Sequence, residues 1–107
     1  MTIAVREYLD ASGEAPFAHW LDSLDAIAAA KVGTALYRLE QGNFSRVEGV
    51  SGGIYECKIN FGPGYRVYFG KDGEAVIILL GGGSKKRQNA DISAALSCWQ
   101  DYKGRKR

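Results

Sequence analysis

Residues 54–80 read IYECKINFGPGYRVYFGKDGEAVIILL, and this stretch decides the fold class. Turn residues divide it twice, at Phe61-Gly-Pro-Gly64 and at Lys71-Asp-Gly73, and Asp-Gly favours a tight hairpin. The stretch therefore predicts three strands, at residues 54–60, 65–70 and 74–80, that pair as an antiparallel meander. The third is almost entirely apolar, which is typical of a strand buried on both faces.

Periodic apolar residues and turn residues predict four further elements. They are a strand at residues 2–8, a helix from Pro16 to Leu24, a second helix from Ala26 to Glu40, and a last helix with its apolar stripe from Ile92 to Tyr102. The predicted order is β-α-α-β-β-β-α, an α+β fold in which helices cover one face of the sheet and the first strand joins an edge. Three glycines at 81–83 are expected to end the meander, and residues 103–107 to form a short, frayed basic tail.

The length of 107 residues predicts a single domain, residues 1–107, with one core. The two cysteines are interpreted as small buried hydrophobes in a reducing cytosol, although pairing is the alternative. One histidine and isolated cysteines provide no metal-ligand spacing, so no metal is expected. With no apolar run of about 20 residues and no signal peptide, a cytoplasmic protein without membrane contact is expected.

Charge is distributed unevenly along the chain. Residues 1–50 carry four basic and seven acidic side chains, whereas residues 51–107 carry ten basic and five acidic ones. This asymmetry is compatible with a surface for a polyanion, or with scattered solvated charges.

One face of the first hairpin is apolar, and alternation assigns the polar residues to the other face. That second face gathers Glu56, Lys58, Asn60, Arg66 and Tyr68. In either allowed register, Lys58 lies opposite Arg66 or Tyr68, or one pair away. The pattern indicates either a cationic site or a solvated face of an antiparallel sheet.

A second basic cluster follows the glycines, at Ser84-Lys-Lys-Arg87. Cations at the start of a helix oppose its dipole, and sequences tend to break such a rule where function requires it. A solvated loop is the alternative. Taken together, the two clusters predict a phosphate-binding site at the sheet face and its edge, although the glycines match no nucleotide-binding fingerprint.

Three segments carry a resemblance to a known family. They are GIYECKINFGPGYRVYF at 53–69, LLGGGSKKRQNADI at 79–92 and PFAHWLDSL at 16–24. In order and spacing, the chain resembles toxins of the RelE/ParE superfamily, most closely the HigB-like, phage Gp49-like branch of addiction-module killer proteins. The resemblance implies the toxin of a type II toxin–antitoxin system, an endoribonuclease that cleaves messenger RNA on the ribosome without metal or cofactor.

The resemblance also implies roles for individual residues. Arg66 matches the strand arginine of the ribosome-dependent members, Lys58 the second of two strand lysines, and Lys85 or Lys86 the basic residue after the last strand. These cations would stabilise the phosphorane formed when a 2′-hydroxyl attacks the adjacent phosphate. Glu56 stands in place of the first strand lysine, and Glu56 or Lys58 would take the 2′-proton.

Two tyrosines and one arginine complete the implied RNA site. Tyr68 or Tyr65 would stack on a base, Tyr68 could also act as an acid–base group, and Arg87 would contact the RNA backbone. The tyrosine that some members carry early in the last helix has no counterpart, because Ile92 falls near that place. Expected partners are the ribosome, messenger RNA and an antitoxin of helix-turn-helix type that is encoded beside the toxin.

Two alternatives stay open. A gyrase-binding toxin of the ParE kind shares the fold without the catalytic basic set. The presence of Arg66 and of Lys85 and Lys86 argues against a gyrase-binding toxin, whereas Glu56 is compatible with it. The second alternative is a non-toxic module that only binds an antitoxin.

Overall fold

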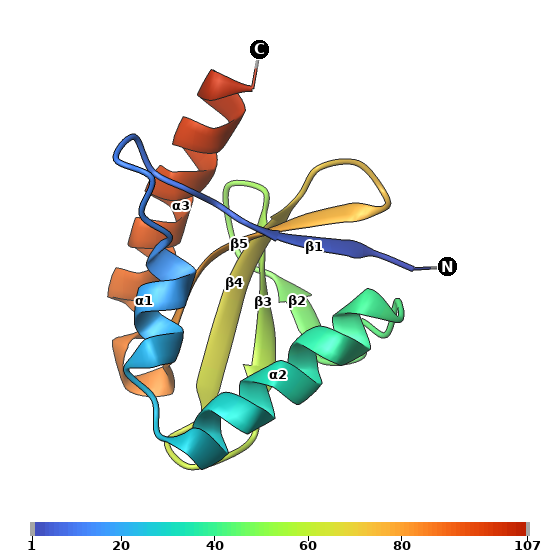
Figure 1. Cartoon of the computed structure of the whole chain (residues 1–107), viewed down its shortest axis with the longest axis vertical. Helices are drawn as coiled ribbons and strands as arrows, with labels where there is room; N and C mark the ends of the chain where they lie inside the picture. The colour runs from blue at the N-terminus through green and yellow to red at the C-terminus, as the bar shows by residue number, and fades with distance from the viewer. Residues whose placement is uncertain (1, 107) are drawn as a thin grey trace.

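The computed structural model describes residues 2–106, and it confirms the α+β class (Figure 1). Its elements along the chain are β1 (Ala4–Glu7), α1 (Pro16–Asp22), α2 (Ala26–Glu40), β2 (Val47–Gly49), β3 (Ile54–Ile59), β4 (Tyr65–Lys71), β5 (Val76–Ser84), the short 3-10 helix η1 (Lys85–Arg87) and α3 (Gln88–Arg105). Asp25 separates the first two helices by capping α2, accepting a hydrogen bond from the Ala28 amide at 2.8 Å. No helix within residues 2–106 is long and apolar enough to cross a membrane.

The five strands form one sheet in the order β1-β5-β4-β3-β2. The antiparallel meander of β3, β4 and β5 is confirmed, and β1 joins its edge by parallel pairing with β5. Strand β2 was not predicted. Its three residues are too few to show an alternation, and they pair antiparallel with β3 at the opposite edge.

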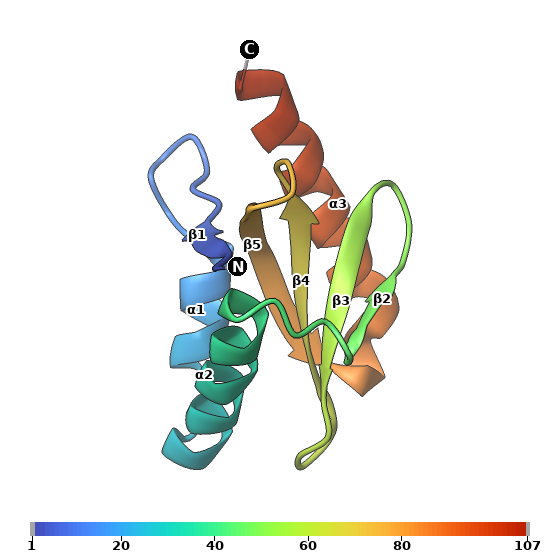
Figure 2. The ribbon, with the colours of Figure 1, turned by 90° about the vertical axis from the view of Figure 1, so that its right-hand side faces the viewer.

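Helices cover both faces of the sheet, as Figure 2 shows, with α1 and α2 on one side and α3 on the other. The core under α1 and α2 includes Phe17, Val32, Leu39, Cys57, Val67, Phe69 and Leu79. The core under α3 includes Tyr8, Ile54, Tyr68, Ile78, Leu80 and Trp99. The expectation that helices cover only one face was therefore wrong. The polar face of the hairpin lies partly under α3.

The three glycines do not end the meander, because β5 continues through them to Ser84. Gly82 faces α1, and a Cβ atom built on it would lie 2.3 Å from the ring of Trp20. Gly83 faces α3, and its Cβ atom would lie 1.8 Å from the carboxylate of Asp91. Glycine is therefore required here for close packing of helices on the sheet.

The prediction that the basic tail is frayed was also wrong for residues 103–106. Helix α3 extends to Arg105, whose Nε donates to Asp101 at 2.8 Å, and the following Lys106 pairs with Asp72. The second of these contacts ties the end of α3 to the turn between β4 and β5. Arg107 lies outside the described residues.

Candidate functional site

The register of the sheet brings the predicted basic residues to one end of the hairpin. Lys58 on β3 pairs directly with Arg66 on β4, which in turn pairs with Gly83 on β5. Glu56 pairs with Tyr68 one step further along. The predicted grouping of these side chains on one sheet face is therefore confirmed, and the register opposes Lys58 to Arg66.

Arg66 is held in a nearly buried ion pair. Its Nη1 donates to Oε2 of Glu56 at 3.0 Å, and the two side chains are 11% and 4% exposed. Gln88, from the first turn of α3, donates to the other oxygen of Glu56 at 3.1 Å. Glu56 thus fixes Arg66 through one oxygen and the start of α3 through the other, which restricts the rotamers of the guanidinium.

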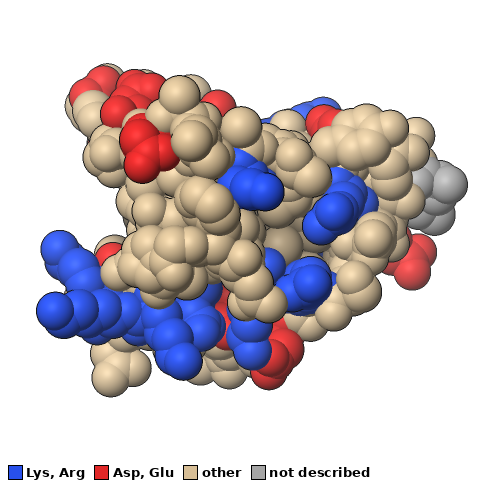
Figure 3. All heavy atoms as spheres, turned by 90° about the horizontal axis from the view of Figure 1, so that it is seen from below, with Lys and Arg blue, Asp and Glu red and all other residues tan. Residues whose placement is uncertain are grey.

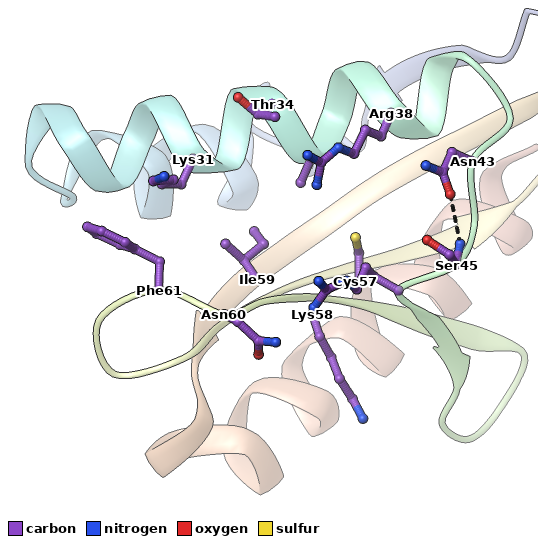
Figure 4. A pocket seen from close by; sticks show the side chains of 12 residues that line it. Lys31, Thr34, Arg38, Asn43, Ser45, Cys57, Lys58, Ile59, Asn60 and Phe61 are labelled. Carbon is purple, nitrogen blue, oxygen red and sulfur yellow. Dashed lines mark hydrogen bonds between the residues drawn. The ribbon is translucent and has the colours of Figure 1, made fainter.

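Lys58 is the more accessible cation on this face, with 37% of its side chain exposed. Its ammonium group pairs with Glu48 on β2, and this hydrogen bond lowers the pKa of the Glu48 carboxyl. Figure 4 shows the Lys58 side chain pointing away from α2, toward the α3 side of the sheet. The unpredicted β2 strand therefore adds a carboxylate to a face that was expected to be cationic.

Tyr68 does not belong to the accessible part of the site, contrary to expectation. It is fully buried beneath α3, and burial raises the pKa of its hydroxyl to about 12. Within residues 2–106 its hydroxyl has no hydrogen-bond partner, and the same holds for Nε of Arg66 and Oδ2 of Asp91. A side chain in this position can neither stack on a base nor exchange a proton with a bound RNA.

The Tyr68→Phe variant is expected to fold like the natural protein. The free energy of unfolding at neutral pH should stay the same or rise by about 1 kcal/mol, because the change removes a buried hydroxyl without a partner. The pKa of the Tyr68 hydroxyl is about 10 in the unfolded chain and about 12 in the folded protein. Ionisation therefore favours the unfolded chain, and the free energy of unfolding falls as the pH rises from 10 toward 12. Urea unfolding from pH 8 to 12 should therefore show a steeper loss for the natural protein than for Tyr68→Phe. An equally steep loss in both proteins would contradict the buried position of this hydroxyl.

Three exposed cations lie next to Arg66, on η1. The amide of Lys85 donates to the carbonyl of Gly64 at 2.7 Å, which ties η1 to the β3–β4 turn. Lys85, Lys86 and Arg87 form no ion pair with a carboxylate of residues 2–106, and they line an open hollow of about 420 Å³ with Gln88 to Ala90. Seen from below in Figure 3, basic side chains gather on this end of the molecule.

Tyr65 is separated from this cluster by the sheet. It lies on the face covered by α1 and α2, where its ring packs edge-on against Trp20 with a centroid distance of 6.2 Å. The expectation that Tyr65 would stack on an RNA base beside Arg66 is therefore not supported by its position. Alternation along β4 places the two neighbours on opposite faces.

Sequence reasoning missed three residues of the site. Glu48 was overlooked because β2 was not recognised, and Gln88 and Asp91 because nothing in the periodicity of α3 shows which sheet face it covers. Asp91 lies against Gly83, and burial raises the pKa of its carboxyl. An available signal was the run of apolar residues in β5, which requires cover on both faces.

Comparison with known proteins agrees with this geometry. Residues 19–96 match the family described as phage-derived protein Gp49-like (DUF891). An uncharacterized protein of Haemophilus influenzae is 38% identical over 96 residues, which cover 89% of this chain and 91% of the relative. An α+β domain with a basic sheet edge is compatible with the RelE-like class of toxins. The chain belongs to the Gp49-like family, a RelE/ParE-like family of addiction-module toxins, and this membership implies an antitoxin partner.

Proposed function

We propose that this toxin is a metal-independent endoribonuclease that cleaves messenger RNA on the ribosome. The observation that supports this most is the position of Arg66, fixed by Glu56 at the same end of the sheet as Lys58 and the η1 cations. Fixed positive groups aimed at a developing charge are usually the largest contribution to catalysis of this kind. A cytoplasmic location follows from this substrate.

In the proposed reaction, the 2′-oxygen attacks the adjacent phosphorus while the bond from phosphorus to the 5′-oxygen breaks. Arg66 and Lys85 or Lys86 stabilise the negative phosphorane, with Arg87 on the neighbouring backbone. Lys58 takes the 2′-proton after passing its own proton to the Glu48 carboxylate with which it is paired, because Glu56 is already engaged with Arg66 and Gln88. An η1 lysine protonates the leaving 5′-oxygen. The products are a 2′,3′-cyclic phosphate and a 5′-hydroxyl.

The double variant Lys85→Gln/Lys86→Gln is expected to lower the cleavage rate at least tenfold without changing the melting temperature, because both side chains are exposed. The measurement is cleavage of a defined message on purified translating ribosomes. Arg6→Gln on β1 removes an exposed cation elsewhere and serves as the matched control. Equal rates for the double variant and the control would remove η1 from the proposed mechanism.

A gyrase-binding toxin is the second candidate, and the observation that favours it is the pairing of Arg66 with Glu56. A carboxylate at 3.0 Å offsets part of the charge that catalysis requires. Supercoiling by purified gyrase in the presence of the toxin separates the candidates. Inhibition of supercoiling with intact messages would replace the nuclease proposal.

A further inference from the structure

A second basic site lies on the other side of the sheet, in a cleft between α2 and the edge of β3 (Figure 4). The cleft has a volume of about 220 Å³. Lys58 is among the residues that line it, but the Lys58 side chain points away from α2, whereas the sulfur of Cys57 points into the cleft (Figure 4). None of the proposed catalytic side chains therefore needs to enter this cleft.

The cleft is cationic although it is built mainly from the acidic half of the chain. Lys31 and Arg38 come from α2 and Arg46 from the segment before β2, and none of its lining residues is acidic. No carboxylate of residues 2–106 forms an ion pair with these three side chains. Figure 4 shows Arg38 extending from α2 toward β3. The three cations are thus available to an anionic partner.

The floor of the cleft is apolar. Ala35, Cys57 and Ile59 form it, and each of them is at least nine-tenths buried. Burial raises the pKa of the Cys57 thiol although Arg38 and Arg46 act in the opposite direction, so the thiol stays neutral at physiological pH. At one end Lys31 lies over the ring of Phe61, 5.4 Å from its centroid. A ligand that fills the cleft must therefore combine negative charge with apolar groups.

Apart from Lys58, the remaining lining residues carry neutral groups that both donate and accept hydrogen bonds. They are Thr34, Asn43, Ser45 and Asn60. A polypeptide backbone presents donors and acceptors in equal number, whereas a phosphate backbone presents acceptors only. This lining can therefore both donate to and accept from a polypeptide backbone laid along the cleft.

We propose that this cleft docks an extended segment of the antitoxin in which acidic side chains alternate with small apolar ones. The acidic side chains face Arg38, Arg46 and Lys31, and the apolar ones lie on the floor formed around Ile59. The existence of an antitoxin rests on the family membership, and the surface is assigned by charge complementarity. Docking here does not depend on the nuclease proposal, because Arg38, Arg46 and Lys31 take no part in the proposed reaction.

The test measures binding and is independent of RNA cleavage. A fluorescent twelve-residue peptide that alternates glutamate with leucine or alanine is titrated with the full chain, beside a peptide with glutamine for glutamate and a twelve-nucleotide single-stranded RNA. Arg38→Gln/Arg46→Gln is compared with Arg6→Gln, which removes an exposed cation outside the cleft. Circular dichroism checks that each variant is folded.

The acidic peptide is expected to bind more tightly than the glutamine peptide and to lose about tenfold in affinity in Arg38→Gln/Arg46→Gln, with little change in Arg6→Gln. Absence of peptide binding, or equal affinity in all folded variants, would overturn the proposal. So would an affinity loss in this double variant that is as large for the RNA as for the peptide, because the cleft would then be a site for polyanions in general.

Discussion

Cells that express the Arg66→Ala variant are expected to keep growing, and the purified variant should cleave messages on the ribosome about 100- to 1,000-fold more slowly. The physical reason is that the guanidinium is the one cation of the site held in place by a nearly buried partner, Glu56 at 3.0 Å. Loss of a fixed group of this kind typically costs two to three orders of magnitude in rate. Growth after induction and single-turnover cleavage provide the two measurements.

Loss of activity in Arg66→Ala has a second possible origin, because the change leaves Glu56 buried without its cation. Removal of one partner from a buried pair typically destabilises a protein by about 3–5 kcal/mol, a large part of the stability of a domain of this size. The double variant Glu56→Gln/Arg66→Gln removes both charges and keeps two amides that can bond to each other. We expect it to be folded and still inactive.

The matched comparison is Arg66→Lys, which keeps the charge but not the planar fork that bonds to Glu56 and a phosphate together. It should retain a small part of the activity. Any variant that lacks Arg66, melts like the natural protein and still stops growth would remove this residue from the catalytic set.

The hairpin could be predicted in detail because two local rules determine it. Alternation decides which side chains share a face, and the short turn between Ile59 and Tyr65 leaves only neighbouring registers, of which the structure adopts the one that sets Lys58 against Arg66. The basic cluster at Lys85 and Lys86 was recognised because cations are unfavourable at the start of a helix. These features depend on neighbouring residues, so the sequence carries them.

The parts that were missed depend on contacts between distant segments. The apolar stripe of α3 predicts that Ala95 and Trp99 are buried, but it does not state which sheet face they cover. That choice places Gln88 on Glu56 and buries Tyr68, so the accessible site differs from the set of residues that alternation gathers on one face. The basic cleft was missed for a related reason, because its cations come from a half of the chain with a net negative charge.

A single methyl group at Gly82 is expected to cause a large loss of stability. A Cβ atom there would lie 2.3–2.5 Å from three carbons of the Trp20 ring, well below contact distance. The ring cannot simply move away, because Phe17 and Tyr65 pack against it with centroid distances of 5.9 and 6.2 Å. Gly82→Ala should therefore lower the free energy of unfolding by about 1–3 kcal/mol, measured by urea denaturation.

Gly83→Ala is the control, since it adds the same methyl group one residue later on the other face. Its Cβ atom would meet the carboxylate of Asp91, which is the end of a flexible side chain, has an Oδ2 without a hydrogen-bond partner within the described residues, and can shift more easily than the Trp20 ring. The loss of stability should be clearly smaller than for Gly82→Ala. A smaller residue in place of Trp20, as in Trp20→Leu, should offset part of the Gly82→Ala effect, because the two positions share one contact.

Activity in the same variants tests what the glycines are for. If Gly82 serves the packing of α1, the Gly82→Ala protein should cleave messages at its normal rate at a temperature where it remains folded. If the glycine instead allows a phosphate to approach the backbone, the folded variant should lose cleavage while its stability changes little. The contact with Trp20 supports the first outcome, because the side of Gly82 where a Cβ atom would stand is already occupied by the ring.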